Sequence, residues 1–301
     1  MKPLTSKNAI LKRLDGQTVF RLKNSAKKAQ KLENEWTAKV AEYLKKNESA
    51  ILESLINGDK PKVNLEDLLV EHYFEVSIES QKDAKASVPS RQRPKERLAK
   101  LPVVKIPKAF SDLMKLYDQW KKGKYTPKRP KAIADKITKE YLKRVQSVWD
   151  KHSEDFRSGK TYTLDEAKEE IRQIGKTTQS RAATIVRTET TNYYNEARRK
   201  VYDQSPEVTH YLFLAVRDAA TTPWCMPGHT DGKRGRHGLV YKKGDPLTDD
   251  ETPGCHWNCR SEFVPLTPDN PSHLKLIEDK SLQRRNHQCY ALPKGWKGHG
   301  A

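Results

Sequence analysis

Two short clusters of cysteine and histidine near the C-terminal end of the chain have the spacing of metal ligands. The first cluster, WCMPGH, contains Cys225 and His229, and the second, GCHWNC, contains Cys255, His256 and Cys259. Four-coordinate zinc takes thiolates and imidazoles from two such short clips. The spacings C-x-x-x-H and H-x-x-C make Cys225, His229, His256 and Cys259 the candidate ligands of one structural zinc ion, which would supply part of the folding free energy.

Other interpretations of the same cysteines remain open at this point. The side chains could hydrogen-bond across tight turns, with each cysteine buried as a small hydrophobic residue. Cys255 could replace His256 as a ligand, and a disulfide within Cys225, Cys255 and Cys259 would suit a particle that matures outside the cell. Cys289 is isolated from both clusters, and we assign it no role.

His256 and Asn258 also have the residue types of a His-Asn nuclease, which hydrolyses DNA through a metal-polarised phosphate. Such a site needs a second histidine, and His229 or His237 could supply it. No glycine-rich phosphate loop or paired acidic metal site accompanies these residues in the sequence. We therefore expect the closing motif to be structural and the protein not to be an enzyme.

The composition narrows the class of protein. In 301 residues, 35% are hydrophobic and 32% are charged, which is typical of long solvated helices. The sequence has no apolar run of about twenty residues and no signal peptide, so we expect neither a membrane-spanning nor a secreted protein. Four cysteines are too few for a disulfide scaffold. Closely spaced cysteine and histidine residues therefore indicate metal binding rather than a disulfide.

The chain is strongly basic, with a formal net charge of +19, and most of the excess lies in residues 91–150. A polyanion, most often nucleic acid, is the natural partner of such a segment, although lysines can also serve only to keep a protein soluble. The candidate contacts flank a Gly and Pro break in KKGKYTPKRPK: Lys121, Lys122, Lys124, Lys128, Arg129 and Lys131. We expect them to contact phosphates of double-stranded DNA without sequence preference.

Periodicity predicts helices followed by a small mixed module. Helices are expected at 25–57, 65–76, 109–122, 131–152 and 179–202, with strands at 208–216 and 261–266. A capping box of Thr163 and Glu166 should open a short helix that ends before Gly175. The predicted fold class is α+β: an extended, mainly helical N-terminal half and a small α/β, loop-rich C-terminal module. The predicted domains are 1–88, a basic region at 89–159, the module at 160–267 and an extended tail at 268–301.

An ordered set of motifs in the C-terminal half resembles the phage Mu F-like minor head protein family. The set comprises RTETTNYYNEAR (187–198), a strand ending at Asp218, Cys225, Asp231-Gly232 and PGCHWNCR (253–260). It spans residues 160–266, about a third of the chain. The residues that carry the motif are Arg187, Thr188, Glu189, Asp218, Gly232 and Arg260. Two positions depart from the family pattern, because Ala220 replaces an arginine and Ser261 replaces a final cysteine.

The resemblance implies a minor capsid protein of a tailed bacteriophage. Such a protein would bind the portal during procapsid assembly, contact scaffolding or major capsid protein, and act in genome packaging or ejection. It would lie in the capsid interior near the portal, after assembly in the host cytoplasm, with no membrane partner. Within the motif we expect Arg187 and Glu189 to form an ion pair, and Asp218 and Asp231 to cap turns.

Overall fold

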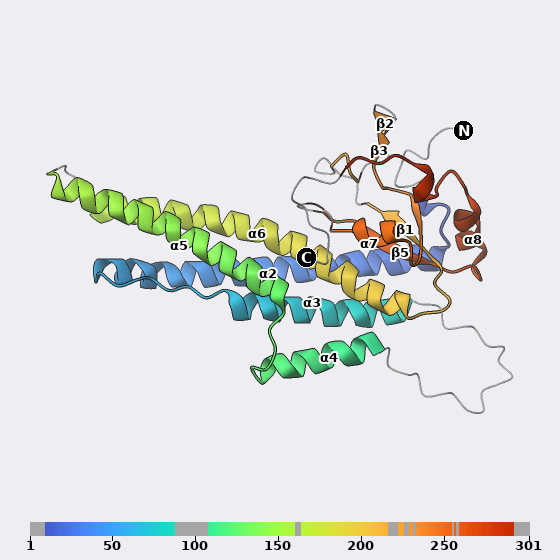
Figure 1. The fold of residues 1–301 in the computed structure, drawn as a ribbon, viewed down its shortest axis with the longest axis horizontal. Helices are drawn as coiled ribbons and strands as arrows, with labels where there is room; N and C mark the ends of the chain where they lie inside the picture. Colours follow the sequence, from blue (N-terminus) through green and yellow to red (C-terminus); the bar gives the residue numbers. More distant parts are fainter. Residues whose placement is uncertain are drawn as a thin grey trace. The chain divides into compact units, whose positions relative to one another are not determined.

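The structure is a computed structural model, and Figure 1 shows its helices and strands. It describes residues 10–87, 108–159, 164–215, 222–225, 229–230, 233–254, 256 and 259–291. The chain forms two compact units. The helical unit comprises Leu32–Phe74 and Gln119–Arg187, and the sheet unit comprises Met1–Lys31, Glu75–Asp118 and Thr188–Ala301.

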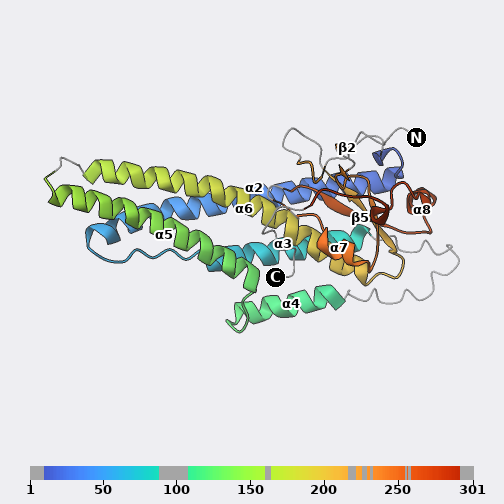
Figure 2. The same ribbon diagram turned by 45° about the horizontal axis from the view of Figure 1, so that its top comes forward.

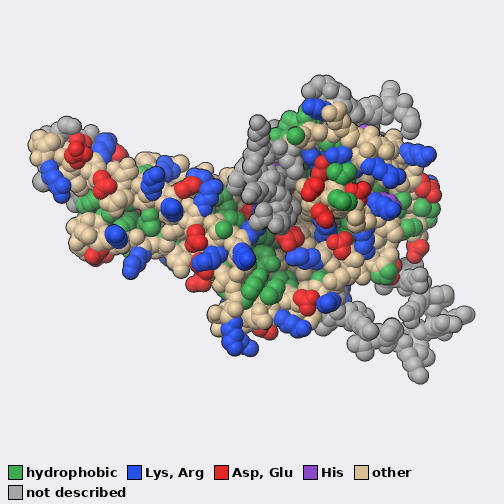
Figure 3. Space-filling model, viewed as in Figure 1, with side chains coloured by type: hydrophobic (Ala, Val, Ile, Leu, Met, Phe, Trp, Pro, Cys, Tyr) green, Lys and Arg blue, Asp and Glu red, His purple; other side chains and the backbone are tan. Residues whose placement is uncertain are grey.

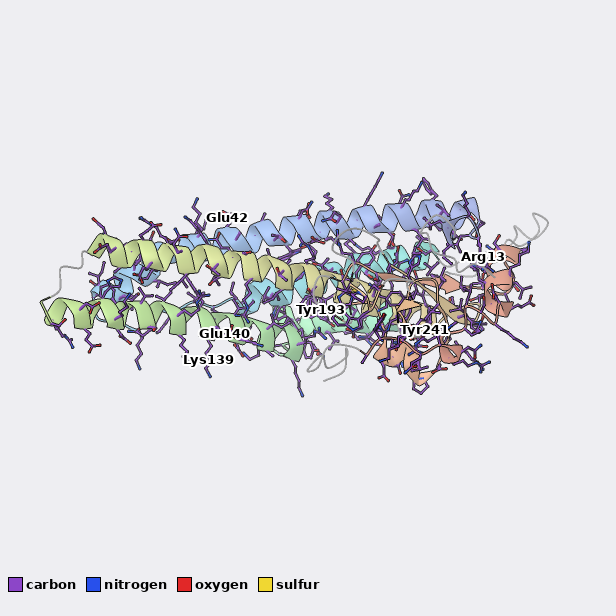
Figure 4. The ribbon with its side chains drawn as sticks, turned by 90° about the horizontal axis from the view of Figure 1, so that it is seen from above. Arg13, Glu42, Lys139, Glu140, Tyr193 and Tyr241 are labelled. Carbon is purple, nitrogen blue, oxygen red and sulfur yellow. The ribbon has the colours of Figure 1, made fainter. Side chains whose placement is uncertain are left out.

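The helical unit is built on apolar stripes at helical spacing. In α2 (Gly16–Ile56), Trp36, Val40 and Leu44 are buried at four-residue steps, as the sequence predicts. In α5 (Lys128–Arg157) the stripe contains Ile137, Tyr141 and Val145. Figures 1 and 2 show α5 alongside α6 (Leu164–Asp203), and Arg181 of α6 forms an ion pair with Glu140, which is labelled on α5 in Figure 4.

The helix α6 is longer than the sequence suggests. The prediction that a helix ends before Gly175 is wrong, because α6 continues without a break from Leu164 to Asp203. Its buried stripe runs through the glycine, and its members are Ala167, Ile171, Ile174, Ala182 and Val186. Packing of a continuous stripe outweighs the cost of about 1 kcal/mol for one interior glycine. Thr163, the expected cap, lies outside the described residues.

The sheet unit contains a three-stranded antiparallel sheet in the order β4-β1-β5. The central strand β1 (His210–Leu214) and the edge strand β5 (Glu262–Leu266) confirm the two predicted strands. The second edge, β4 (Val240–Lys242), was not predicted. A two-stranded ribbon of β2 (His229–Thr230) and β3 (Lys233–Arg234), and the short helix α7 (Pro246–Asp250), complete the connections.

Both faces of the sheet are buried, and each has its own chemistry. One face is mainly aromatic, with Tyr211, Phe213, Tyr241 and Phe263 in contact with one another. The opposite face is aliphatic: Leu212, Leu214, Val240, Val264 and Leu266 pack with Ile10, Leu14, Leu22, Leu276 and Leu282. Alternation along a strand sends neighbouring residues to opposite faces, so a strand that is covered on both sides reads as continuously apolar. The aromatic face also contains Cys225 and Cys259.

The segment after the sheet is folded. The prediction of an extended tail from residue 268 is wrong for α8 (Pro271–Glu278) and for the 3-10 helix η2 (Arg284–Asn286). Asn270 caps α8 by accepting hydrogen bonds from the amides of Ser272 and His273 at 2.9 and 3.4 Å. Leu276 and Leu282 are buried in the aliphatic cluster, which explains why this polar sequence does not remain extended. Residues 292–301 lie outside the described part.

The remaining helices agree with the predictions, and the fold class α+β is confirmed. The helices predicted at 65–76 and 109–122 correspond to α3 (Glu66–Ser87) and α4 (Lys108–Lys121). The polar link between them falls mostly in residues 88–107, outside the described residues. No described helix combines the length and apolar character needed to cross a membrane.

Candidate metal centre

Cys225, His256 and Cys259 meet in the interior of the sheet unit. Their potential ligand atoms all lie within 4.8 Å of one another, and the side chains are 2%, 3% and 1% exposed. Cys225 Sγ lies 2.8 Å from His256 Nε2. Each clip is closed by a backbone bond typical of a turn: the Cys225 amide donates to Thr222 O at 3.0 Å, and the Cys259 amide donates to His256 O at 3.3 Å.

Hydrogen-bond donors point at both sulfur atoms. The amide of Gly254 donates to Cys259 Sγ at 3.2 Å, and the hydroxyl of Ser261 donates to Cys225 Sγ at 3.3 Å. Thr222 Oγ1 lies 3.2 Å from His256 Nε2. Such outer contacts orient ligand side chains and stabilise thiolates in metal sites. Ser261, which replaces the family's final cysteine, therefore lies beside the site.

The electrostatics of the two thiols favour a cation between them. The hydrogen bond with Cys259, followed by burial and by the charge of Cys259, raises the pKa of Cys225 well above its usual value. Two adjacent buried thiols cannot both ionise without a compensating positive charge. A divalent metal supplies that charge and deprotonates the thiols as it binds.

The three residues fit a tetrahedral metal in donor type and spacing. Ligand atoms around zinc lie roughly 3.4–3.8 Å apart, so the three atoms would need shifts of only about 1 Å. Cys225 and Cys259 are free thiols in the structure, so the alternative of a disulfide between these two is not formed. The other candidate ligands, the side chain of His229 and all of Cys255, lie outside the described part of the chain, as does Asn258.

A polar face of α6 holds the segment that carries His256 and Cys259. Asn195 donates to Ser261 O at 3.0 Å and accepts from the Phe263 amide at 3.2 Å, so one side chain pairs with the backbone on either side of β5 residue Glu262. Arg198 pairs with Glu262 at 2.9 Å and donates to Ser25 Oγ at 2.8 Å. These contacts fix the end of the second clip on a rigid helix.

Arg199 of α6 contacts the residues that come just before this segment in the chain. Arg199 donates to Thr248 O at 3.2 Å and to Thr252 Oγ1 at 2.8 Å, and it forms an ion pair with Asp249. About two turns before Arg199, Asn192 donates to Glu189 Oε1 at 3.3 Å within the same helix. Arg199 and Asn195, which are one turn apart on α6, therefore anchor the chain before and after the clip.

The segment 236–239 holds the first clip from the other side. The amides of Arg236 and His237 donate to Trp224 O and Cys225 O at 2.9 and 3.2 Å. The ring of His237 accepts a hydrogen bond at Nδ1 from the Ala215 amide, at 3.1 Å. This bond joins the residue after β1 to the segment that holds the clip, which gives His237 a structural contact.

Residues 146–264 match the family model described as Phage Mu protein F like protein. We call this segment, which is similar to that family, the Mu F-like region. Neither the curated proteins nor the solved structures gave a match to the chain.

The motif residues of the Mu F-like region have structural contacts where they are described. The expected ion pair of Arg187 with Glu189 is wrong, because Arg187 Nε pairs with Glu33 Oε1 at 2.6 Å. Residues two positions apart on a helix point in different directions, so the pair could not have formed easily. Thr188 is fully buried and Arg260 is exposed. The turn residues of the motif lie outside the described residues: Asp218, Ala220, Asp231 and Gly232.

Sequence reasoning missed the supporting residues of the Mu F-like region. Asn192, Asn195 and Arg198 are buried, and they recur every three residues along α6. Polar residues at this spacing share one helix face, and asparagine is unfavourable inside a helix. This pattern was available in the sequence as a sign that the face binds other parts of the chain.

The basic candidates lie at the junction of α4 and α5, within the helical unit. Lys121, Lys122, Lys124, Lys128 and Lys131 are exposed and Arg129 is half-buried. The ammonium of Lys121 lies 4.4 Å from the centre of the Trp120 ring, a cation–π contact. Lys131 forms an ion pair with Glu66, and the hydrogen bond with this carboxylate raises the pKa of Lys131. The carboxylate also offsets part of the positive charge that Lys131 presents to a partner.

Proposed function

We propose that this protein is a minor capsid protein of a tailed phage that acts in head morphogenesis through binding. The match of residues 146–264 to the Mu F-like family carries this proposal. The sheet unit would serve as a rigid anchor, and the portal would be its partner during procapsid assembly. Scaffolding or major capsid protein would be neighbouring partners, and genome packaging or ejection would be the step that the protein supports.

Within this function, the metal centre would be a structural zinc site. Cys225, His256 and Cys259 supply two sulfurs and one nitrogen, the donor set that zinc prefers over magnesium or calcium. Burial of all three side chains argues for a closed, structural site rather than a catalytic one, which keeps an open position for substrate. The ion would join the turn at Thr222–Cys225 to the segment before β5, thus fixing two loops that have little apolar core of their own.

The basic junction of α4 and α5 is the candidate DNA contact. Its eleven residues, 121–131, contain six cations and no carboxylate. On the face shown in Figure 3, by contrast, basic side chains alternate with acidic ones over much of the surface. Such a basic segment, in which Lys131 forms an ion pair with Glu66, would bind phosphates by displacing counterions, without reading the bases.

Neutralising this loop should weaken DNA binding and flatten its salt dependence. In the triple variant Lys121→Gln, Lys122→Gln and Lys124→Gln, we expect the slope of log K against log salt for a short duplex to fall by about 2.7, or roughly 0.9 per contact. Fluorescence anisotropy at several salt concentrations measures this slope.

The matched control for this experiment is Lys45→Gln, Lys60→Gln and Lys62→Gln, which removes three exposed lysines elsewhere in the helical unit. It should leave the slope within about one contact of the wild type. Equal slopes for the two triple variants would show that the loop has no special part in DNA binding.

Binding to the portal is tested with the portal protein of the same phage. We expect the purified chain to co-elute with the portal on size-exclusion chromatography at a salt concentration of about 0.3 M, where exposed charges are largely screened. An unrelated protein of similar net charge, run as a control, should elute separately. Separate elution of this chain and the portal would contradict the portal part of the proposal.

A further inference from the structure

A cavity of about 340 Å³, lined by both apolar and charged side chains, lies in the sheet unit, where the edge strand β4 meets α8 and η2. Its volume is within the range of small-ligand sites. Five basic side chains line it: His210, Lys242, Lys280, Arg284 and Arg285. Neither the metal centre nor the basic loop at 121–131 includes any of these residues, so the cavity is a separate feature of the chain.

Arg284, which lines the cavity, belongs to a cluster with more cations than carboxylates. Arg284 donates through Nε and Nη2 to the two carboxylate oxygens of Glu251, at 2.6 and 2.7 Å. The same carboxylate also pairs with Arg236 at 3.0 Å and accepts the Tyr241 hydroxyl at 2.7 Å. Two guanidinium groups thus share one carboxylate. Tyr241, labelled in Figure 4, contributes its neutral side chain to the lining.

The rim adds cations that have no carboxylate partner. Lys242, Lys280 and Arg285 are exposed, and they form no ion pair with any described residue. Two carboxylates also line the cavity, Asp245 and Glu278. Asp245 already accepts a hydrogen bond from the Leu247 amide at 2.9 Å as the cap of α7, so it is held at the helix end.

The cations around the cavity affect the pKa of His210. Burial, followed by the charges of Lys242 and Arg285, lowers the pKa of its imidazole. Since His210, Lys242 and Arg285 all line the cavity, the two cations lie beside the imidazole whose charged form they repel. An anion placed between them would relieve this repulsion and would be bound by charge-assisted hydrogen bonds.

We propose that this cavity is a phosphate-binding site, with Lys242 and Arg285 as its principal contacts and Arg284, held by Glu251, as a further cation in its lining. Either a backbone phosphate of DNA or a free phosphate group would present the required chemistry. The site does not depend on the proposed function, because it shares no residue with 121–131 and needs no portal.

The test uses the full chain and inorganic phosphate followed by ³¹P NMR line broadening. In Lys242→Gln/Arg285→Gln we expect the apparent Kd for phosphate to rise roughly tenfold or more, because two charge-assisted hydrogen bonds are lost. The matched control is Lys23→Gln/Lys275→Gln, which removes two exposed cations of the same unit that do not line the cavity. Equal phosphate affinity in the two double variants would overturn the proposal.

A second measurement uses the wild type, so it can be made even if Lys242→Gln/Arg285→Gln folds poorly. In the wild type, bound phosphate should raise the pKa of His210, followed through its imidazole NMR signal and assigned with His210→Gln. A His210 signal unmoved by saturating phosphate would overturn the proposal. A duplex DNA titration then separates the two sources: a DNA backbone phosphate predicts a salt slope lowered by about 1.8 in Lys242→Gln/Arg285→Gln, and a free phosphate predicts an unchanged slope.

Discussion

Cys259→Ser is expected to remove the metal and a large part of the stability of the sheet unit. The wild type, purified without chelators, should contain one zinc per chain by plasma mass spectrometry, and the variant should contain far less. A serine hydroxyl is a poor zinc ligand, and loss of a structural metal typically costs about 4 kcal/mol or more. Thermal unfolding should therefore show a clearly lower midpoint for the variant.

The chain offers a matched control in Cys289→Ser. Cys289 is a half-buried thiol that packs at the edge of the aromatic cluster but is not among the three grouped ligands. The Cys289→Ser variant should retain the zinc and most of the stability of the wild type. A chelator should lower the midpoint of the wild type to that of Cys259→Ser and leave the variant unchanged, because the variant has no metal to lose.

Two results would contradict the proposal of a structural zinc site. If the wild type contains no metal, the two clips are turns held by hydrogen bonds such as those from Gly254 and Ser261 to the sulfurs. If Cys259→Ser keeps a full complement of zinc, the ion is bound elsewhere. Acid should also release the metal, because protons compete for both thiols and for His256, and because the hydrogen bond with Cys259, burial and the charge of Cys259 raise the pKa of Cys225.

The ligands of this centre could be predicted from the sequence, but the residues that support them could not. Residue type and spacing were enough to select Cys225, His256 and Cys259, because short metal clips are local in sequence. The contacts of Thr222 and Ser261 with the ligands were not visible, because they join segments more than thirty residues apart. Spacing carries no information on such contacts.

The fold shows the same division between local and long-range information. The long helices and the strand β1 follow from periodicity and from β-branched and aromatic content, which are local. The three residues of β4 were missed because only their pairing with β1 makes them a strand. The break expected at Gly175 failed for a related reason, since contacts of α6 with other helices override local propensity.

Gly254→Ala is the substitution for which the structure predicts the largest cost of a single methyl group. Gly254 has φ +99°, a conformation that residues with a side chain rarely adopt. A Cβ there would lie 1.6 Å from Asn192 Oδ1 and 3.1 Å from Asn192 Cα, so rotation of the asparagine side chain alone cannot relieve the contact fully. Asn192 is fully buried. We expect a loss of about 3 kcal/mol or more in urea unfolding.

Gly244→Ala separates the two sources of this cost. Gly244 has φ +78°, but no atom lies within 4 Å of the position that a Cβ would take, so this variant should lose only the backbone term of about 1–2 kcal/mol. The double variant Asn192→Ala/Gly254→Ala should recover part of the difference, because the closest atom is removed. Equal costs at the two glycines would show that α6 does not press against the clip. Since the Gly254 amide also donates to Cys259 Sγ, a real displacement should weaken zinc binding in Gly254→Ala and not in Gly244→Ala.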